Sequence, residues 1–185
     1  MERRRLSASA ITRVALMAAV TAAAAQIAIP IPPVPFTLQV LAVILSGLLL
    51  GPRYGALAQA VYVLVGAVGV PVFSEFSGGL GVILGPTGGY LVSYPIAAAV
   101  AGLAAPAVAG GVRRRALFLG FLWGCASLAV IYALGATWLA VVTDLPAGII
   151  LVQGVLIFVP FDLIKVALAT LVAVAVAPAV GALRT

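Results

Sequence analysis

Long apolar segments, each about twenty residues, are the feature that most limits how this chain can fold. A helix of that length crosses a hydrocarbon layer roughly 30 Å thick. Hydrophobic residues make up 65% of the 185 residues and charged residues only 8%, whereas a soluble domain is about one quarter charged. The sequence therefore predicts an all-α integral membrane protein, with residues 1–185 forming a single domain of six transmembrane helices. The expected helices are Ile11–Ile29, Phe36–Leu50, Tyr54–Val70, Gly88–Val108, Ala116–Leu139 and Phe161–Val180.

The positions of the arginines predict how these helices are oriented. Every second connection is basic, and the three others contain no basic residue, only Glu75 and Asp144. Because basic connections stay in the cytoplasm, we expect both termini to be cytoplasmic. The arginines are Arg3, Arg4, Arg5 and Arg13 before the first helix, Arg53 after the second, Arg113, Arg114 and Arg115 after the fourth, and Arg184 after the sixth.

Prolines predict where three of the helices begin. The stretch Ile149–Val180 would be about 48 Å long as one helix, which exceeds the hydrocarbon core. We therefore expect a break at Pro160, preceded by a short helix at the outer face. The letters Val-Pro-Phe occur at Val34 and again at Val159, and Pro86 precedes the fourth helix. Since proline suits the first turn of a helix, the second, fourth and sixth helices are expected to start at the outer surface.

Polar side chains gather near these outer helix ends. Asp162 and Lys165 begin the sixth helix, and Lys165 is the single lysine of the chain. Polar groups inside a bilayer usually face a cavity or the bundle interior, so the sequence predicts one outward-opening pocket beside three helix N-termini, which favour an anion. Gln59, toward the inner end of the third helix, is an exception. The other members of the set are Gln26, Thr37, Gln39, Thr87 and Tyr90.

The pair formed by Asp162 and Lys165 has two interpretations. At three residues apart the two side chains share a helix face and can simply neutralise each other, with Lys165 reaching outward. A buried pair, however, seldom stabilises a fold more than apolar residues would, so its presence favours recognition of a ligand. Asp162 accepts hydrogen bonds and Lys165 donates them. A ligand with N–H donors and a carbonyl or carboxylate would satisfy both.

Two segments rich in small residues can be interpreted either as purely structural or as functional. The glycine-rich segment Ser77–Gly89 lacks the Gly-Lys-Ser/Thr ending of a P-loop. It is either a tight external turn or a place where backbone approaches a small ligand or another helix closely. In the first helix, Ala15 and Ala19 are four residues apart. Such spacing lets a partner helix dock, although the same residues could be filler.

Three segments give the chain a recognisable resemblance: "PVPFTLQ" from Pro33, "GGLGVILGPTGGY" from Gly78 and "FDLIK" from Phe161. In these, and nearly end to end, it resembles the BioY family of biotin transporters. The resemblance implies the six-helix fold of an S component, the substrate-capturing subunit of an energy-coupling-factor (ECF) importer, in the bacterial cytoplasmic (inner) membrane. It implies biotin as the transported ligand, with a membrane T protein and two cytoplasmic ATP-binding subunits as partners. It implies no cofactor, no metal and no nucleic acid.

The resemblance also implies roles for particular residues. The Asp-x-x-Lys signature of the family falls on Asp162 and Lys165, its GPTGGY signature on Gly85–Tyr90, and its docking motif for the T protein on Ala15 and Ala19. Asp162 would accept hydrogen bonds from the ureido N–H groups of biotin, while Lys165 would donate to the ureido carbonyl or to the carboxylate. The remaining expected ligand residues are Thr37, Gln39, Thr87, Gly88 and Gly89, with Phe36, Phe73 and Tyr90 over the apolar ring.

Other functions agree less well with the sequence. An intramembrane enzyme would need a second acid or base, yet the chain has no histidine, and Glu75 is the only further carboxylate with a plausible position. Without a phosphate-binding lysine motif, energy must come from partners, or transport is passive. An S component for another vitamin, or a solitary biotin transporter without dedicated ATPases, remain alternatives. A purely structural subunit would leave the outer polar residues unexplained.

Overall fold

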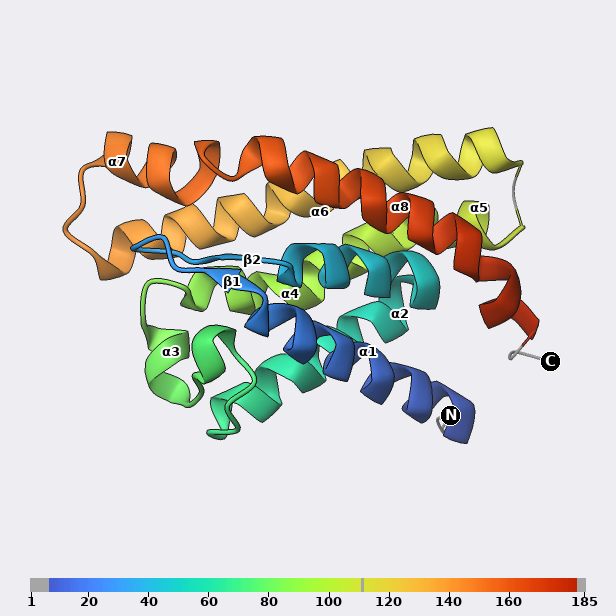
Figure 1. Ribbon diagram of the computed structural model, residues 1–185, viewed down its shortest axis with the longest axis horizontal. Coiled ribbons are helices and arrows are strands. Elements are labelled where there is room, and N and C mark those ends of the chain that lie inside the picture. The colour runs from blue at the N-terminus through green and yellow to red at the C-terminus, as the bar shows by residue number, and fades with distance from the viewer. Residues whose placement is uncertain (1–6, 111, 183–185) are drawn as a thin grey trace, which may run out of the picture.

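A computed structural model describes residues 7–110 and 112–182 as a bundle of long helices (Figure 1). Five helical stretches of these residues are long and apolar enough to cross a membrane. They are α1 (Ala8–Gln26), α2 (Gln39–Ala67), α4 (Gly88–Ala101) continued by α5 (Ala105–Gly110), α6 (Arg113–Val142), and α7 (Ala147–Leu151) leading into α8 (Val159–Ala182). The shorter elements are the antiparallel strands β1 (Ala28–Ile29) and β2 (Phe36–Thr37), and helix α3 (Leu80–Leu84).

Helix α2 consists of two antiparallel arms. Gly51 adopts φ 80° and ψ 175°, a conformation open to glycine and costly for other residues, and Pro52 follows it. A hydrogen bond of 3.1 Å joins Gln59 Nε2 to Ser46 Oγ across 13 residues, whereas the same separation along a straight helix would be about 20 Å. The arms are the predicted second and third helices, so the described part of the chain fits six spans.

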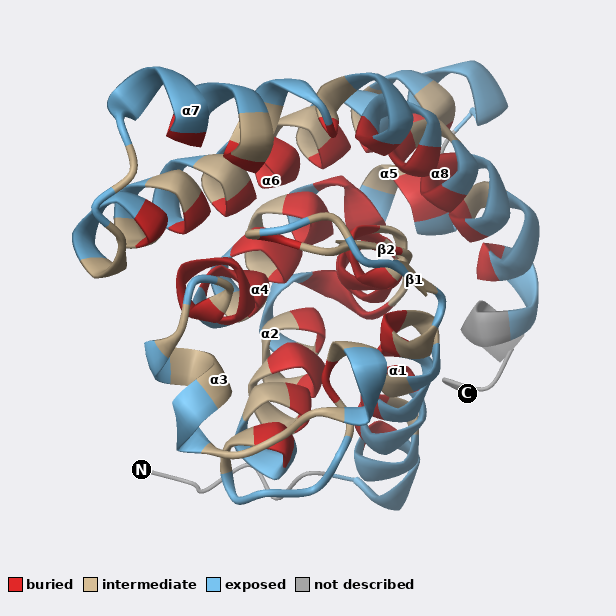
Figure 2. Cartoon of the chain, turned by 60° about the vertical axis from the view of Figure 1, so that its left-hand side comes forward, coloured by how far each residue is buried: buried red, intermediate tan, exposed pale blue. Residues whose placement is uncertain are grey.

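Helix α4 occupies the centre of the bundle, between α2 and α6, and α8 packs on both α2 and α6. Small residues occupy the most tightly packed positions of α4: Ala97, Ala98 and Ala101 are fully buried. Figure 2 shows buried residues facing the interior and exposed residues facing outward. Large apolar side chains such as Phe118 of α6 and Leu168 of α8 are exposed, as expected for helices surrounded by lipid. The chain is a multi-pass membrane protein.

A small polar cluster lies fully buried between α1 and the two arms of α2. Gln59 Nε2 donates hydrogen bonds to Thr21 Oγ1 at 3.0 Å and to Ser46 Oγ at 3.1 Å. The hydroxyls of Thr21 and Ser46 in turn donate to the backbone carbonyls of Met17 and Val43. We call Thr21, Ser46 and Gln59 the interhelix cluster, because their hydrogen bonds join three helical segments to one another.

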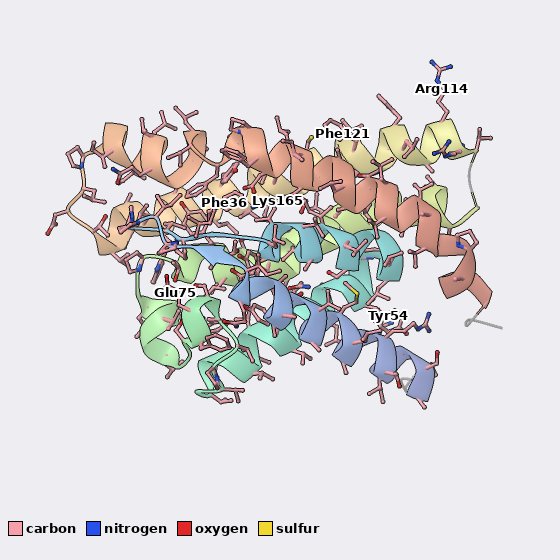
Figure 3. All side chains as sticks on the ribbon, in the orientation of Figure 1. Phe36, Tyr54, Glu75, Arg114, Phe121 and Lys165 are labelled. Carbon is pink, nitrogen blue, oxygen red and sulfur yellow. The ribbon has the colours of Figure 1, made fainter. Side chains whose placement is uncertain are left out.

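Arginine-bearing parts of the fold share one end of the bundle. The start of α1, the turn within α2 and the start of α6 lie together at this end (Figure 1). Arg114 points away from the bundle there (Figure 3). This grouping agrees with the alternating charge of the connections, and the cytoplasmic location of this end remains a prediction from the arginines. Arg3, Arg4, Arg5 and Arg184 lie outside the described residues.

The first two helices differ in their boundaries from the predicted ones. Helix α1 ends at Gln26 instead of Ile29, because Ala28 and Ile29 pair with Thr37 and Phe36 in a short antiparallel ladder. Helix α2 consequently begins at Gln39, three residues later than expected. At the other end of α1, Ser7 Oγ accepts a hydrogen bond from the amide of Ala10 and starts the helix three residues before Ile11.

The segment before Pro160 contains the predicted short helix, α7, but this helix does not lie apart from the one that follows. α7 leads into α8 through a π-helical turn at Val152–Leu156, and the two helices run in line beside α6 (Figure 1). Pro160 is the second residue of α8, a first-turn position where its missing N–H has little cost. The helix therefore begins near Pro160 as predicted, but the chain before it continues helically along the same direction.

Candidate ligand pocket

A pocket opens at the end of the bundle where α2, α4 and α8 begin. The empty space in it amounts to about 580 Å³, which includes space open to solvent at its mouth. Gln39 begins α2, Thr87 immediately precedes α4 and Asp162 lies in the first turn of α8, and all three line it. The predicted site residues that line the pocket are Phe36, Thr37, Gln39, Phe73, Thr87, Tyr90, Asp162 and Lys165.

Asp162 and Lys165 form a buried ion pair in the wall of the pocket. Lys165 Nζ lies 2.7 Å from Asp162 Oδ1, and the two side chains are only 5% and 4% exposed. Lys165 also donates a hydrogen bond to the carbonyl oxygen of Thr37 at 2.6 Å. The hydroxyl of Tyr132 donates to Asp162 Oδ2 at 2.7 Å. The interpretation in which Lys165 reaches outward to solvent is therefore wrong, because its ammonium group is held inside the bundle.

Both ions retain hydrogen-bonding capacity after these contacts. Among the described residues Asp162 accepts one hydrogen bond at each oxygen, which leaves about half of the lone-pair sites of a carboxylate. Lys165 uses two N–H groups for Asp162 and Thr37. Its Nζ also lies 3.6 Å from the centre of the Phe36 ring, a cation–π arrangement. The pair can thus accept and donate further hydrogen bonds within the pocket.

Polar residues at the start of α2 extend this network away from the ion pair. Thr37 Oγ1 donates to Gln39 Oε1 at 2.8 Å, and Gln39 Nε2 donates to the hydroxyl of Tyr62 at 2.5 Å. These bonds fix the orientation of the Gln39 amide, which is only 4% exposed. We call Asp162, Lys165, Tyr132, Thr37 and Gln39 the pocket cluster.

Aromatic rings form the apolar walls of the pocket. The Phe36 ring stacks on Phe158 with centroids 6.2 Å apart and meets the edge of Phe161 at 5.5 Å. Figure 3 shows Phe36 beside Lys165 in the interior of the bundle. Tyr90 also lines the pocket, and its hydroxyl donates to the carbonyl of Gly154 in the π-helical turn at 2.8 Å. A Cβ atom at position 154 would lie only 2.7 Å from this hydroxyl, which explains why the residue there is a glycine.

Gly88 and Gly89 were predicted to bind ligand, but neither is among the residues that line the pocket. A Cβ atom on Gly88 would collide with the carbonyl of Ile83, and one on Gly89 would collide with Trp138 of α6. The indole N–H of Trp138 donates to the carbonyl of Gly85 at 3.0 Å. The glycines therefore allow the start of α4 to pack closely against α6, which places Thr87 and Tyr90 at the pocket.

The two predicted docking residues lie elsewhere. Ala15 and Ala19 are exposed on α1, whereas Val14, Met17 and Ala18 on the other side of the helix are buried. The two alanines therefore lie on a side of α1 that a further helix could contact. Glu75 is exposed in the connection between α2 and α3.

Sequence reasoning missed Tyr132, Tyr94 and Phe158, which also line the pocket. Tyr132 is the most consequential omission, because it donates directly to Asp162. Its position in the apolar run "AVIYALGA" hid it among hydrophobic residues. A signal was present, since a buried tyrosine hydroxyl needs a hydrogen-bond partner.

Comparison with known proteins adds a consistent set of matches. The family described as the BioY family matches residues 1–182. The probable biotin transporter BioY of Pyrococcus horikoshii is 45% identical over 168 residues, covering 91% of this chain and 96% of that protein. The biotin transporter BioY of Thermotoga maritima is 48% identical over 151 residues, covering 80% and 84%. The crystal structure of an S-component for biotin from an ECF-type ABC transporter superposes with a TM-score of 0.80 at 25% identity, covering 95% and 94%.

Proposed function

The chain belongs to the BioY family, and on that premise we propose that it captures biotin at the outer face of the membrane and delivers it inward as the S component of an ECF importer. The family consists of membrane transporters, so the chain is not an enzyme. The observation that carries the proposal is the buried pair of Asp162 and Lys165, which keeps free hydrogen-bonding capacity in the wall of a pocket.

The polar groups of biotin match this capacity. The ureido ring has two N–H donors and one carbonyl acceptor. Asp162 supplies acceptor sites and Lys165 a donor, so one edge of the ring, with an N–H group beside the carbonyl, can satisfy both ions at once. Such charge-assisted hydrogen bonds are strong because the pair is removed from water. The ligand thereby gives a buried ion pair a role beyond mutual neutralisation.

The apolar part of biotin matches the aromatic walls. Phe36, Phe158 and Tyr94 border the same pocket as the ion pair, and the thiophane ring offers apolar surface to them. The anionic valerate tail would extend toward the mouth, where Thr87 lies immediately before the N-terminus of α4. Lys165 is the alternative partner of this carboxylate.

Binding of labelled biotin to the purified chain in detergent tests the ligand, with Asp162→Asn as the decisive variant. The asparagine presents N–H donors where the ligand needs an acceptor, so affinity should fall by about 1–3 kcal/mol, which is roughly five-fold to more than a hundred-fold. Asp144→Asn is the matched control, because Asp144 is exposed in the α6–α7 connection and is not a pocket residue. Unchanged affinity in Asp162→Asn would move the ureido site elsewhere.

Partner subunits are the second element of the proposal. The S-component neighbour comes from an ECF-type ABC transporter, and the chain has no phosphate-binding lysine motif of its own. We therefore expect a membrane T protein and two ATP-binding subunits to power delivery. Uptake by vesicles that contain this chain alone, without nucleotide or partners, would instead favour a solitary biotin transporter. Tight binding of a different vitamin would favour the other alternative.

A further inference from the structure

Gln26, the last residue of α1, holds the segment that follows the second arm of α2. Its Nε2 donates to the carbonyl of Phe73 at 3.0 Å and lies 3.4 Å from the carbonyl of Val72. Its Oε1 accepts a hydrogen bond from the amide of Phe76 at 3.0 Å. One side chain therefore contacts both sides of the turn between Val72 and Phe76.

The segment 72–77 forms part of the pocket wall. Phe73 and Ser74 line the pocket, and Phe73 is buried against the edge of Tyr62, with ring centroids 5.6 Å apart. Glu75 and Phe76 have φ values of 58° and 54°, in the left-handed region that non-glycine residues rarely adopt. Neither side chain explains this conformation, because both are exposed. The strained turn therefore depends on backbone contacts such as those made by Gln26.

A chain of hydrogen bonds joins this segment to the ion pair. Lys165 donates to the carbonyl of Thr37, whose hydroxyl donates to Gln39. Gln39 donates to Tyr62, and the Tyr62 hydroxyl donates to the carbonyl of Val72 at 3.2 Å. This is the same carbonyl that faces the Gln26 amide. These hydrogen bonds therefore connect the end of α1 and the segment 72–77 to the ion pair in the wall of the pocket.

We propose that Gln26 is a positioning residue of the ligand site, which acts by holding the segment 72–77 against the pocket. The inference rests on the proposed function. Gln26 is not among the residues that line the pocket, so it affects ligand indirectly, through the segment 72–77 and the hydrogen bonds that join this segment to the ion pair. The segment cannot move away from the pocket without breaking its hydrogen bonds to Gln26. Because this movement opens the pocket wall, Gln26 controls the rate at which ligand leaves.

Gln26→Leu tests this role with two measurements on the full-length protein in detergent. Leucine keeps the approximate size and removes the hydrogen bonds. Hydrogen exchange of amides 72–77 without ligand should become at least ten-fold faster, while exchange in α4 and α6 stays unchanged. The dissociation rate of biotin should rise about ten-fold. Thr12→Val is the matched control, because Thr12 is exposed on the same helix and, among the described residues, its hydroxyl bonds only to the carbonyl of Ala8 within α1; it should change neither quantity.

The outcomes separate the proposal from its alternatives. Unchanged exchange at 72–77 would show that Gln26 does not hold the segment. Faster exchange with an unchanged dissociation rate would show that the segment does not control the ligand. Should Gln26→Leu fail to fold, Gln26→Glu replaces it: glutamate keeps the acceptor for Phe76 but repels the two carbonyls, and the same two changes are expected. Absence of biotin binding by the unaltered chain would refute the proposed function, whereas the exchange measurement would still decide whether Gln26 holds the segment.

Discussion

The two buried polar clusters of this membrane protein differ in what their hydrogen bonds do. In the interhelix cluster, Gln59 uses both N–H groups on Thr21 and Ser46, and the hydroxyls of those residues close back onto their own helices. In the pocket cluster, Asp162 and Lys165 retain capacity toward an open cavity. Burial and polarity are common to both clusters, so neither property identifies a ligand site.

Charge and cavity together distinguish the two clusters. The interhelix cluster is neutral and none of its members lines the pocket; it joins α1 to both arms of α2. One atom of the cluster, Gln59 Oε1, has no hydrogen-bond partner among the described residues. Burying an unpaired neutral acceptor costs much less free energy than burying an unpaired ion. Removing residues from each cluster should therefore affect different properties.

Lys165→Met should have the largest effect. It leaves the carboxylate of Asp162 buried without its counter-ion, so the free energy of unfolding should fall by about 3–5 kcal/mol. Biotin binding should be lost as well. Unfolding in mixed micelles measures the free energy of unfolding, and an equilibrium binding assay measures the affinity for biotin.

The double variant Lys165→Met with Asp162→Asn is the control for this effect. It removes the stranded charge and should recover much of the stability without recovering binding. Equal stability of the single and double variants would show that the pair is not electrostatically coupled. A single variant that binds biotin as tightly as the unaltered chain would remove Lys165 from the site.

A matched pair of hydroxyl deletions gives an intermediate effect and compares the clusters directly. Tyr132→Phe removes the donor that orients Asp162, so biotin affinity should fall several-fold. Thr21→Val removes an acceptor of Gln59 and should lower the free energy of unfolding by about 0.6 kcal/mol, the average for such bonds between membrane helices. Its biotin affinity should be unchanged. If Thr21→Val weakened binding as much as Tyr132→Phe, the two clusters would not be functionally separate.

Ala15→Leu combined with Ala19→Leu should have the smallest effect on the pocket. Both positions are exposed on α1, so biotin affinity in detergent should not change. Uptake by cells that contain the complete importer should be blocked if this side of α1 docks the T protein. A fall in affinity would show instead that these alanines shape the bundle, and undiminished uptake would remove them from the docking surface.

Sequence patterns predicted the helices and much of the pocket because both depend on local chemistry. The prolines and polar residues predicted that the starts of α2, α4 and α8 lie at the same end of the bundle. Gln39, Thr87 and Asp162, which lie at these starts, do line the pocket. Gly88 and Gly89 do not line the pocket, and the sequence could not show this because a glycine that approaches a ligand and one that approaches Trp138 look the same in a sequence. The β1–β2 ladder could not be predicted, since two-residue strands carry no periodic pattern. The partnership of Tyr132 with Asp162 depends on how α6 faces α8, which only the packed structure shows.

The length of two helices has a further consequence for the surrounding bilayer. Helix α6 spans 30 residues, about 45 Å, and α7 continues α8 well past the ion pair along the same side of the bundle. Exposed apolar side chains on this extension, such as Leu151, Val152 and Leu156, need lipid around them. A hydrocarbon layer of about 30 Å can cover both helices only by thickening locally or by letting them tilt. The pocket thus lies beside an apolar stretch of helix that extends past the ion pair, and the thickness of the membrane determines how much of this stretch lies in lipid.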